Sequence, residues 1–83
     1  MVIAYVTDWC PDCTRSRRVL QQMRIRFQEI DIEKAPDAES EMRARNGGSS
    51  RVPTIVIGDK VLVEPTDTEL REALRARVLS AER

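Results

Sequence analysis

The sequence predicts a single α/β domain with the element order β-α-β-α-β-β-α and a four-stranded mixed sheet. The first half alternates short apolar runs with helical patterns, which is typical of parallel strands joined by a crossover helix. The second half places two β-favouring runs around Gly58-Asp59-Lys60, which is typical of an antiparallel hairpin. A chain of 83 residues has room for one such domain, so we assign residues 1–83 to it.

The elements of the first half follow from apolar patterning. Residues 2–6 form a continuous β-favouring run without polar alternation, as in a central strand covered on both faces. Small and apolar residues then recur at helical spacing: Ser16, Val19, Leu20 and Met23. Pro11 can open this helix because its first turn needs no amide donor. Residues 27–32 have a mixed pattern, which favours a second strand nearer the edge of the sheet.

A second helix is expected to start at Pro36 and to end at Asn46-Gly47-Gly48. Its apolar face is thin, with only Ala38 and Met42.

The hairpin strands are expected at residues 54–57 and 61–63. Thr66 and Glu69 form a capping box, in which threonine reaches forward and glutamate reaches back, and this begins the last helix. One face of that helix is expected to be buried, with Leu70, Ala73, Leu74 and Val78.

Charge and hydropathy argue against two kinds of partner. Lys plus Arg and Asp plus Glu both count 14, so no global basic field exists for nucleic acid. The five apolar residues at 2–6 are too few for a signal peptide or a membrane span. Arginines gather around the first helix, either as a local docking face for anions or as solvated surface. We expect a cytoplasmic monomer without nucleic-acid or membrane partners.

Cys10-Pro11-Asp12-Cys13 contains the only two cysteines of the chain and directly follows the first strand. Two intervening residues let a disulfide close and open repeatedly without rebuilding the fold. The chain has no histidine, whereas a zinc site needs about four good ligands. The pair therefore indicates thiol–disulfide chemistry, with an idle structural pair as the weaker alternative.

The two sulfurs are expected to have different roles. Cys10 lies on the loop before the helix, where the positive end of the helix dipole favours a thiolate nucleophile. Cys13 lies one turn into the helix and is the expected resolving thiol. Asp8 and Asp12 oppose a thiolate nearby, although Asp12 also suits the first turn of the helix itself.

Val52-Pro53 precedes the third strand. Proline can begin a strand, and a cis bond here would leave the backbone N–H and C=O of Val52 free for an incoming thiol. An ordinary trans proline is the more frequent arrangement by general statistics.

These motifs together resemble a glutaredoxin of the thioredoxin superfamily over nearly the whole chain. The resemblance covers Tyr5 through the CPxC motif to residues 27–32, then Asn46-Gly47-Gly48, Val52-Pro53-Thr54 and Gly58-Asp59-Lys60. It implies a thioredoxin fold of glutaredoxin type, a cis Pro53, and a thiol–disulfide oxidoreductase with catalytic Cys10 and Cys13. It also implies no bound cofactor and a low-molecular-weight thiol as co-substrate, with disulfide-containing proteins as partners.

Three departures from the family pattern concern the thiol. Thr7 stands where glutathione-dependent relatives carry Lys or Arg, and Val63-Glu64-Pro65-Thr66 replaces their Gly-Gly pair. Arg51 replaces the usual threonine before Val-Pro and could supply the missing cation. The substrate-binding residues implied by the resemblance are Trp9, Pro11, Asp12, Arg51, Val52, Pro53, Thr66 and Asp67.

The chain is most similar to mycoredoxins, in three features: Thr7 with Trp9, Asn46-Gly47-Gly48, and the proline before the last helix. The co-substrate implied by that resemblance is mycothiol, a sugar-linked thiol, with glutathione and bacillithiol as alternatives. Asp12 departs from it, because mycoredoxins are expected to carry an aromatic residue there. Trp9 is either an exposed platform for a substrate or reductase, or partly buried against the helix.

Two functions remain as alternatives to the thiol-dependent oxidoreductase. One is an electron-donor redoxin for ribonucleotide reductase or another target, reduced by a thioredoxin-type reductase. The chain lacks the aromatic and arginine-proline segment of that branch after the hairpin. The other is an iron–sulfur or metal-carrying protein that bridges two copies through Cys10, which Pro11 and the second cysteine make less favoured.

Overall fold

The computed structural model describes the backbone of residues 1–81 and the side chains of residues 1–77. Its elements follow the predicted order: β1 (Val2–Val6), α1 (Pro11–Gln22), β2 (Gln28–Asp31), α2 (Ala38–Arg45), β3 (Thr54–Ile57), β4 (Lys60–Val63) and α3 (Asp67–Ala81).

The four strands form one mixed sheet, as predicted, and their order in the sheet is β2-β1-β3-β4. β1 pairs parallel with β2 and antiparallel with β3, and β3 pairs antiparallel with β4. All residues of β1 are buried, which confirms its central place, whereas β2 is a partly exposed edge strand. The carboxyl end of β1 therefore leads directly from the middle of the sheet into the CPxC segment.

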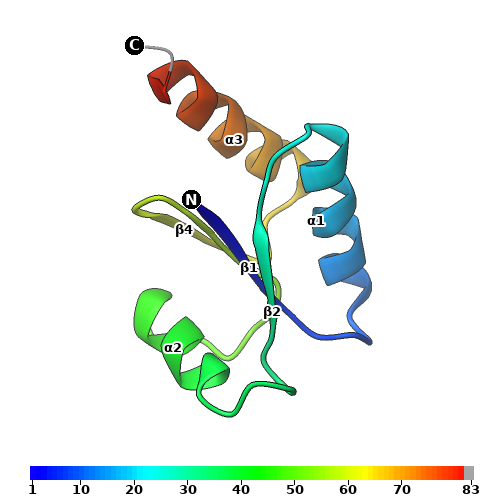
Figure 1. The fold of residues 1–83 in the computed structure, drawn as a ribbon, viewed down its shortest axis with the longest axis vertical. Helices are drawn as coiled ribbons and strands as arrows, with labels where there is room; N and C mark the ends of the chain where they lie inside the picture. Colours follow the sequence, from blue (N-terminus) through cyan, green and yellow to red (C-terminus); the bar gives the residue numbers. More distant parts are fainter. Residues whose placement is uncertain (82–83) are drawn as a thin grey trace.

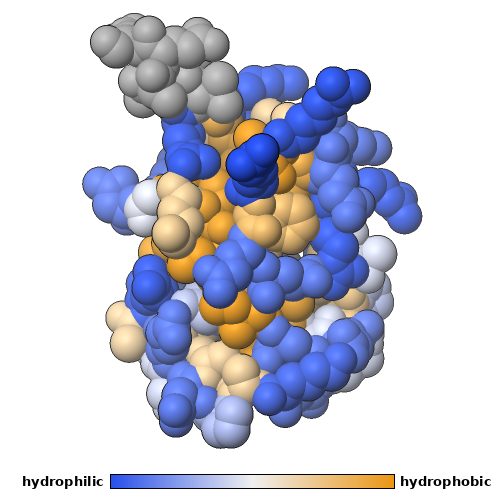
Figure 2. Space-filling view, in the orientation of Figure 1, coloured by the Kyte–Doolittle hydropathy of each residue, from blue (hydrophilic) through white to orange (hydrophobic). Residues whose placement is uncertain are grey.

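Helices cover both faces of the sheet (Figure 1). α1 and α3 lie on one face, where Val19, Leu20 and Leu70 pack with Ala4 of β1. α2 lies on the other face, where its Met42 packs with residues of β1 and β3, such as Tyr5. Alternate residues of β1 serve the two cores because neighbouring side chains of a strand point to opposite faces. Figure 2 shows apolar surface along the β2 side of the molecule, bordered by hydrophilic residues.

Two boundaries differ from the sequence prediction. α2 begins at Ala38 and not at Pro36, because the N–H of Ala38 bonds to the carbonyl of Ala35 in a separate turn before the helix. Lys60 belongs to β4 and pairs with Ile57, so the hairpin turn is the two-residue Gly58-Asp59. Gly58 has φ of 62°, a conformation that glycine adopts without steric cost. The side chain of Val78 lies outside the described residues.

Tyr5 ties the sheet to α2. Its hydroxyl donates a 2.6 Å hydrogen bond to Glu41 Oε1. Burial, together with this bond to a carboxylate, raises the pKa of Tyr5 from 10.0 to about 12.

We expect the only tyrosine of the chain to ionise near pH 12 in the folded protein. The raised pKa means that the neutral phenol stabilises the fold. This stabilisation is complete below about pH 10, the unfolded value, and is lost as the pH rises through about 12. Tyrosinate absorbance during an alkaline titration measures the pKa, and urea unfolding at several pH values measures the stability. Tyr5→Phe should remove this contribution, and a midpoint near 10 in the folded protein would contradict the assignment.

Candidate active site

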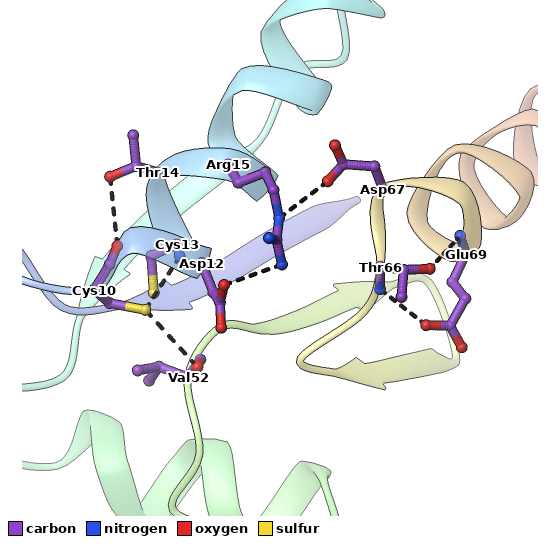
Figure 3. A network of polar contacts seen from close by, with 9 residues as sticks. All are labelled: Cys10, Asp12, Cys13, Thr14, Arg15, Val52, Thr66, Asp67 and Glu69. Atoms are coloured by element: carbon purple, nitrogen blue, oxygen red, sulfur yellow. Dashed lines mark hydrogen bonds and ion pairs between the residues drawn. The ribbon is translucent and has the colours of Figure 1, made fainter.

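Cys10 caps the N-terminus of α1. Its backbone is extended, with φ of −87° and ψ of 113°, and its sulfur accepts the N–H of Cys13 at 3.1 Å (Figure 3). Its carbonyl accepts the N–H of Thr14 at 3.2 Å, which fixes the residue to the first turn. The first N–H groups of a helix have no partner within the helix and carry its positive end. Negative charge that develops on the Cys10 sulfur therefore faces a hydrogen-bond donor and a favourable dipole.

Cys13 lies in the first turn of α1 and is 0% exposed, compared with 7% for Cys10. Burial, followed by the interaction with Cys10, raises the pKa of Cys13 to about 12, so the side chain is a neutral thiol near pH 7. Both cysteines are free thiols in the structure. Their unequal environments agree with an outer sulfur that reacts first and an inner sulfur that acts second.

This difference predicts selective alkylation. With limiting iodoacetamide near neutral pH, we expect Cys10 to react at least about tenfold faster than Cys13, because the thiolate is the reactive form and Cys13 stays protonated. Peptide mapping by mass spectrometry measures the two rates. Faster labelling of Cys13 would show that the assignment of outer and inner sulfur is reversed.

The two carboxylates expected to oppose a thiolate are each paired with a cation. Asp8 Oδ2 lies 2.8 Å from Lys34 Nζ, which lowers the pKa of Asp8. Asp12 Oδ1 lies 3.0 Å from a terminal nitrogen of Arg15, one helical turn away. Both pairs are well exposed, so solvent also screens them. The opposition that these carboxylates present to negative charge on Cys10 is therefore weaker than the sequence alone indicates.

The Val52-Pro53 segment faces Cys10 from the start of β3. The peptide bond is cis, as the resemblance implied, and the side chain of Pro53 is fully buried. The Val52 carbonyl oxygen lies 3.9 Å from the Cys10 sulfur, the length of a weak sulfur contact. Two segments far apart in the chain thus meet at the Cys10 sulfur.

Thr66 and Asp67 take part in contacts at the start of α3. The Thr66 N–H donates to Glu69 Oε1 at 2.8 Å and the Glu69 N–H donates to Thr66 Oγ1 at 3.1 Å, which confirms the capping box. Asp67 Oδ1 lies 3.3 Å from Arg15 Nε, so Arg15 contacts both Asp12 and Asp67 (Figure 3). Arg15 belongs to the arginine cluster predicted around the first helix, but its contacts with the two carboxylates were not predicted, although its spacing from Asp12 was an available signal.

Arg51 does not present a free cation. It is exposed, and its guanidinium lies 3.5 Å from Glu64 Oε2. Glu64 itself adopts a left-handed backbone with φ of 48°, where glutaredoxins that use glutathione were expected to have glycine. The cation expected to compensate for Thr7 is therefore paired with a carboxylate of the segment that replaces the Gly-Gly pair.

Trp9 is 70% exposed, which favours an exposed platform over partial burial against the helix, the two alternatives that the sequence left open. Its indole N–H donates to Glu33 Oε1 at 2.8 Å. Beside it lies a hollow of about 490 Å³ that shares Val52 with the site and is lined by Thr7, Trp9, Ile32, Glu33, Glu39, Ser50 and Val52. The sequence analysis missed Glu33 and Glu39, because nothing in their local pattern places them near Cys10.

Two features of the described residues bear on other classes of protein. Within the part of the chain that the structure describes, no group of three or more His, Cys, Asp or Glu side chains is arranged to hold a metal ion. No helix among the described residues is both long and apolar enough to cross a membrane.

Comparison with known proteins identifies the family. The model of the glutaredoxin family matches residues 2–62. The chain belongs to the glutaredoxin family. This glutaredoxin is 43% identical over 58 residues to a glutaredoxin of Pseudomonas aeruginosa, a match that covers 70% of this chain and 68% of the relative. It is 35% identical over 71 residues to a Mycobacterium tuberculosis protein assigned to the glutaredoxins, with 84% of each chain covered.

The fold agrees with this assignment. The glutaredoxin of Archaeoglobus fulgidus superposes with a TM-score of 0.82 at 28% identity, covering 89% of this chain and 85% of that structure. The predicted thioredoxin fold with a four-stranded mixed sheet is thus confirmed. Glutaredoxins are thiol–disulfide oxidoreductases that act with low-molecular-weight thiols and disulfide substrates and need no prosthetic group, and this chain is an enzyme of that class.

Proposed function

We propose that this glutaredoxin reduces protein disulfides and mixed disulfides through a dithiol formed by Cys10 and Cys13. The observation that supports this most directly is the contact of the Cys10 sulfur with the N–H of Cys13 at 3.1 Å, with Cys13 buried behind it. A helix N-terminus supports negative charge on the attacking sulfur, and the buried thiol is protected from competing reactions. Such a dithiol functions in a reducing compartment, so we place the protein in the cytoplasm.

The reaction is a sequence of thiol–disulfide exchanges. The Cys10 thiolate attacks one sulfur of a disulfide R–S–S–R′, the S–S bond breaks, and R′–S⁻ leaves and takes a proton. The Cys13 thiol then loses its proton and attacks the Cys10 sulfur, which releases R–S⁻ and forms the Cys10–Cys13 disulfide. Two molecules of a small thiol then reduce the Cys10–Cys13 disulfide and are themselves joined in a disulfide. In the whole cycle, two electrons pass from the small thiol to the substrate disulfide.

The interaction between the two sulfurs supports this order of steps. Burial is the main cause of the raised pKa of Cys13, and the interaction with Cys10 adds to it while Cys10 is free. Once Cys10 is bonded to substrate, its sulfur carries no negative charge, and this part of the shift disappears. Cys13 thus becomes easier to ionise at the moment when its attack is required.

Substrate binding is assigned to the backbone and surfaces around Cys10. The N–H and C=O of Val52 are offered to the chain next to the substrate sulfur, as in the addition of an extended strand. Pro11 and Pro53 directly follow Cys10 and Val52 in the chain, and the exposed ring of Trp9 is accessible to the bound segment. Four further residues affect substrate binding through the contacts described above: Asp12, Asp67, Thr66 and Arg51.

We propose mycothiol as the preferred small thiol. Glutathione carries two carboxylates, and this site offers neither of them an unpaired cation among the described residues: Thr7 occupies one position, and Arg51 is paired with Glu64. Glu64 adds negative charge, and Pro65 has no N–H to donate. A sugar-linked thiol without the γ-glutamyl carboxylate avoids both costs.

A coupled assay with a mixed-disulfide substrate tests the proposal, with mycothiol, glutathione or bacillithiol as reductant and a thioredoxin reductase in a parallel reaction. We expect kcat/KM to be highest with mycothiol, about tenfold higher than with glutathione. A difference of this size corresponds to about one unfavourable interaction with a carboxylate. Preference for glutathione would contradict the choice of thiol. Activity with the reductase alone would support the electron-donor redoxin instead, and inactivity in all four reactions would contradict the dithiol proposal.

A further inference from the structure

We infer that the hollow beside Cys10 binds a basic segment of the substrate protein, so that disulfides flanked by lysine or arginine are preferred. We call this hollow the acidic hollow, and it is defined by Thr7, Trp9, Ile32, Glu33, Glu39, Ser50 and Val52. The inference rests on the proposed function and adds the class of protein substrate to it.

The acidic hollow lies where residues next to a substrate cysteine must pass. Trp9 directly precedes Cys10 in the chain, and Val52 both lines the hollow and contacts the Cys10 sulfur at 3.9 Å. A polypeptide whose sulfur reaches Cys10 and whose backbone pairs with Val52 therefore extends its neighbouring side chains over this surface. The volume of about 490 Å³ accommodates one or two long side chains.

The negative charge of the hollow is not balanced by the protein. Neither Glu33 nor Glu39 has a lysine or arginine within ion-pair distance among the described residues. The acidic residues on the other sides of Cys10 do have such partners: Asp8, Asp12, Glu64 and Asp67. The nearest cations along the chain are engaged elsewhere: Lys34 pairs with Asp8 and Asp31, and Arg43, one helical turn from Glu39, donates from Nε to the Gly48 carbonyl at 3.2 Å. Among these acidic residues, only Glu33 and Glu39 lack an ion-pair partner, and both line the acidic hollow.

Thr7 is an independent indication that the hollow takes a hydrogen-bonding ligand. Its side chain is buried, with 3% of the residue exposed, and its hydroxyl has no hydrogen-bond partner among the described residues. Buried hydroxyls are satisfied in most proteins, so an unpaired one on the wall of a hollow calls for a partner.

The groups that line the acidic hollow favour a hydrogen-bond donor as the partner of Thr7. The carboxylates of Glu33 and Glu39 only accept, and lysine and arginine side chains carry only donors. The exposed indole of Trp9 adds a surface to which a cation is attracted. An acidic segment would instead bring further acceptors against two carboxylates.

Binding can be tested without any redox step. Two peptides of identical sequence are compared, with serine in place of the reactive cysteine and either lysine or glutamate on both sides of it. Fluorescence of Trp9, the only tryptophan, reports binding at the hollow. We expect the lysine peptide to bind about tenfold more tightly at low salt, as expected for two exposed ion pairs, and the difference to shrink in high salt.

Variants assign the preference to the hollow. Glu39→Gln should weaken binding of the lysine peptide by about threefold, the effect of one exposed pair, and should not weaken binding of the glutamate peptide. Asp59→Asn removes the same charge from the turn between β3 and β4, at the opposite end of β1, and should change neither affinity. Equal affinity for the two peptides, no binding of either, or equal effects of the two variants would overturn the inference.

Turnover of the corresponding cysteine peptides, each as a mixed disulfide, is measured separately. A lysine preference in binding without turnover overturns the proposed reaction and leaves the basic-segment site standing. Turnover without a lysine preference supports the reaction and overturns the site.

Discussion

Cys10→Ser is expected to abolish turnover of every disulfide substrate, lowering kcat/KM by at least about a thousandfold. A serine hydroxyl does not ionise near neutral pH and is a poor nucleophile toward sulfur, so the helix N-terminus has no thiolate to support. The substitution is nearly isosteric, and the Cys13 N–H that now contacts the sulfur at 3.1 Å can bond to the hydroxyl oxygen. The fold should therefore be retained, which circular dichroism checks beside the coupled assay.

Cys13→Ser is the matched control, because it changes the same atom one helical turn away. We expect this variant to keep turnover of small mixed disulfides, since a second small thiol can release Cys10, and to lose reduction of protein disulfides, which needs the internal attack. Measurable turnover by Cys10→Ser, or complete loss of both activities in Cys13→Ser, would show that the assigned roles are wrong.

Leu20→Ala is expected to lower the free energy of unfolding by about 2–5 kcal/mol. Leu20 is 0% exposed and belongs to the core cluster between the sheet and the α1 and α3 helices. Truncation removes the transfer free energy of the deleted atoms and leaves a cavity that the neighbouring elements fill only in part. Native domains are stable by only about 5–15 kcal/mol, so much of the stability of this small domain would be lost.

Urea unfolding followed by circular dichroism measures this change. Gln21→Ala is the matched control, because Gln21 is exposed on the same helix and its truncation opens no cavity. Its effect should stay within about 0.5 kcal/mol. Equal effects of the two substitutions would show that Leu20 does not contribute to the core as the structure places it.

The distribution of paired charge connects the fold to the choice of substrate. Arg15 joins Asp12 at the start of α1 to Asp67 at the start of α3, so these two carboxylates act mainly within the protein. Glu33 and Glu39 come from the segment between β2 and α2 and from α2 itself, on the other side of Cys10. The carboxylates on the two sides of the reactive sulfur therefore differ in whether an arginine pairs with them.

Most of the fold follows from short-range patterns in the sequence. The uninterrupted apolar run of residues 2–6 predicted the central strand, and the stripe through Leu20 predicted the buried face of α1. The Thr66–Glu69 capping box also formed as expected. The start of α2 was placed two residues early, because a proline is compatible with a preceding turn as well as with a helix. Such boundaries depend on a few backbone hydrogen bonds that residue type does not determine.

The sequence by itself determined the chemistry of this protein: two cysteines, two residues apart, after a strand and at the start of a helix. Those relations are local, so residue spacing is enough to specify them. Only the tertiary structure decided what surrounds the reactive sulfur. It exposed Trp9, paired Arg51 with Glu64, and brought Glu33 and Glu39 beside Val52. These groups come from separate segments, and their proximity depends on how the sheet and its connecting loops pack.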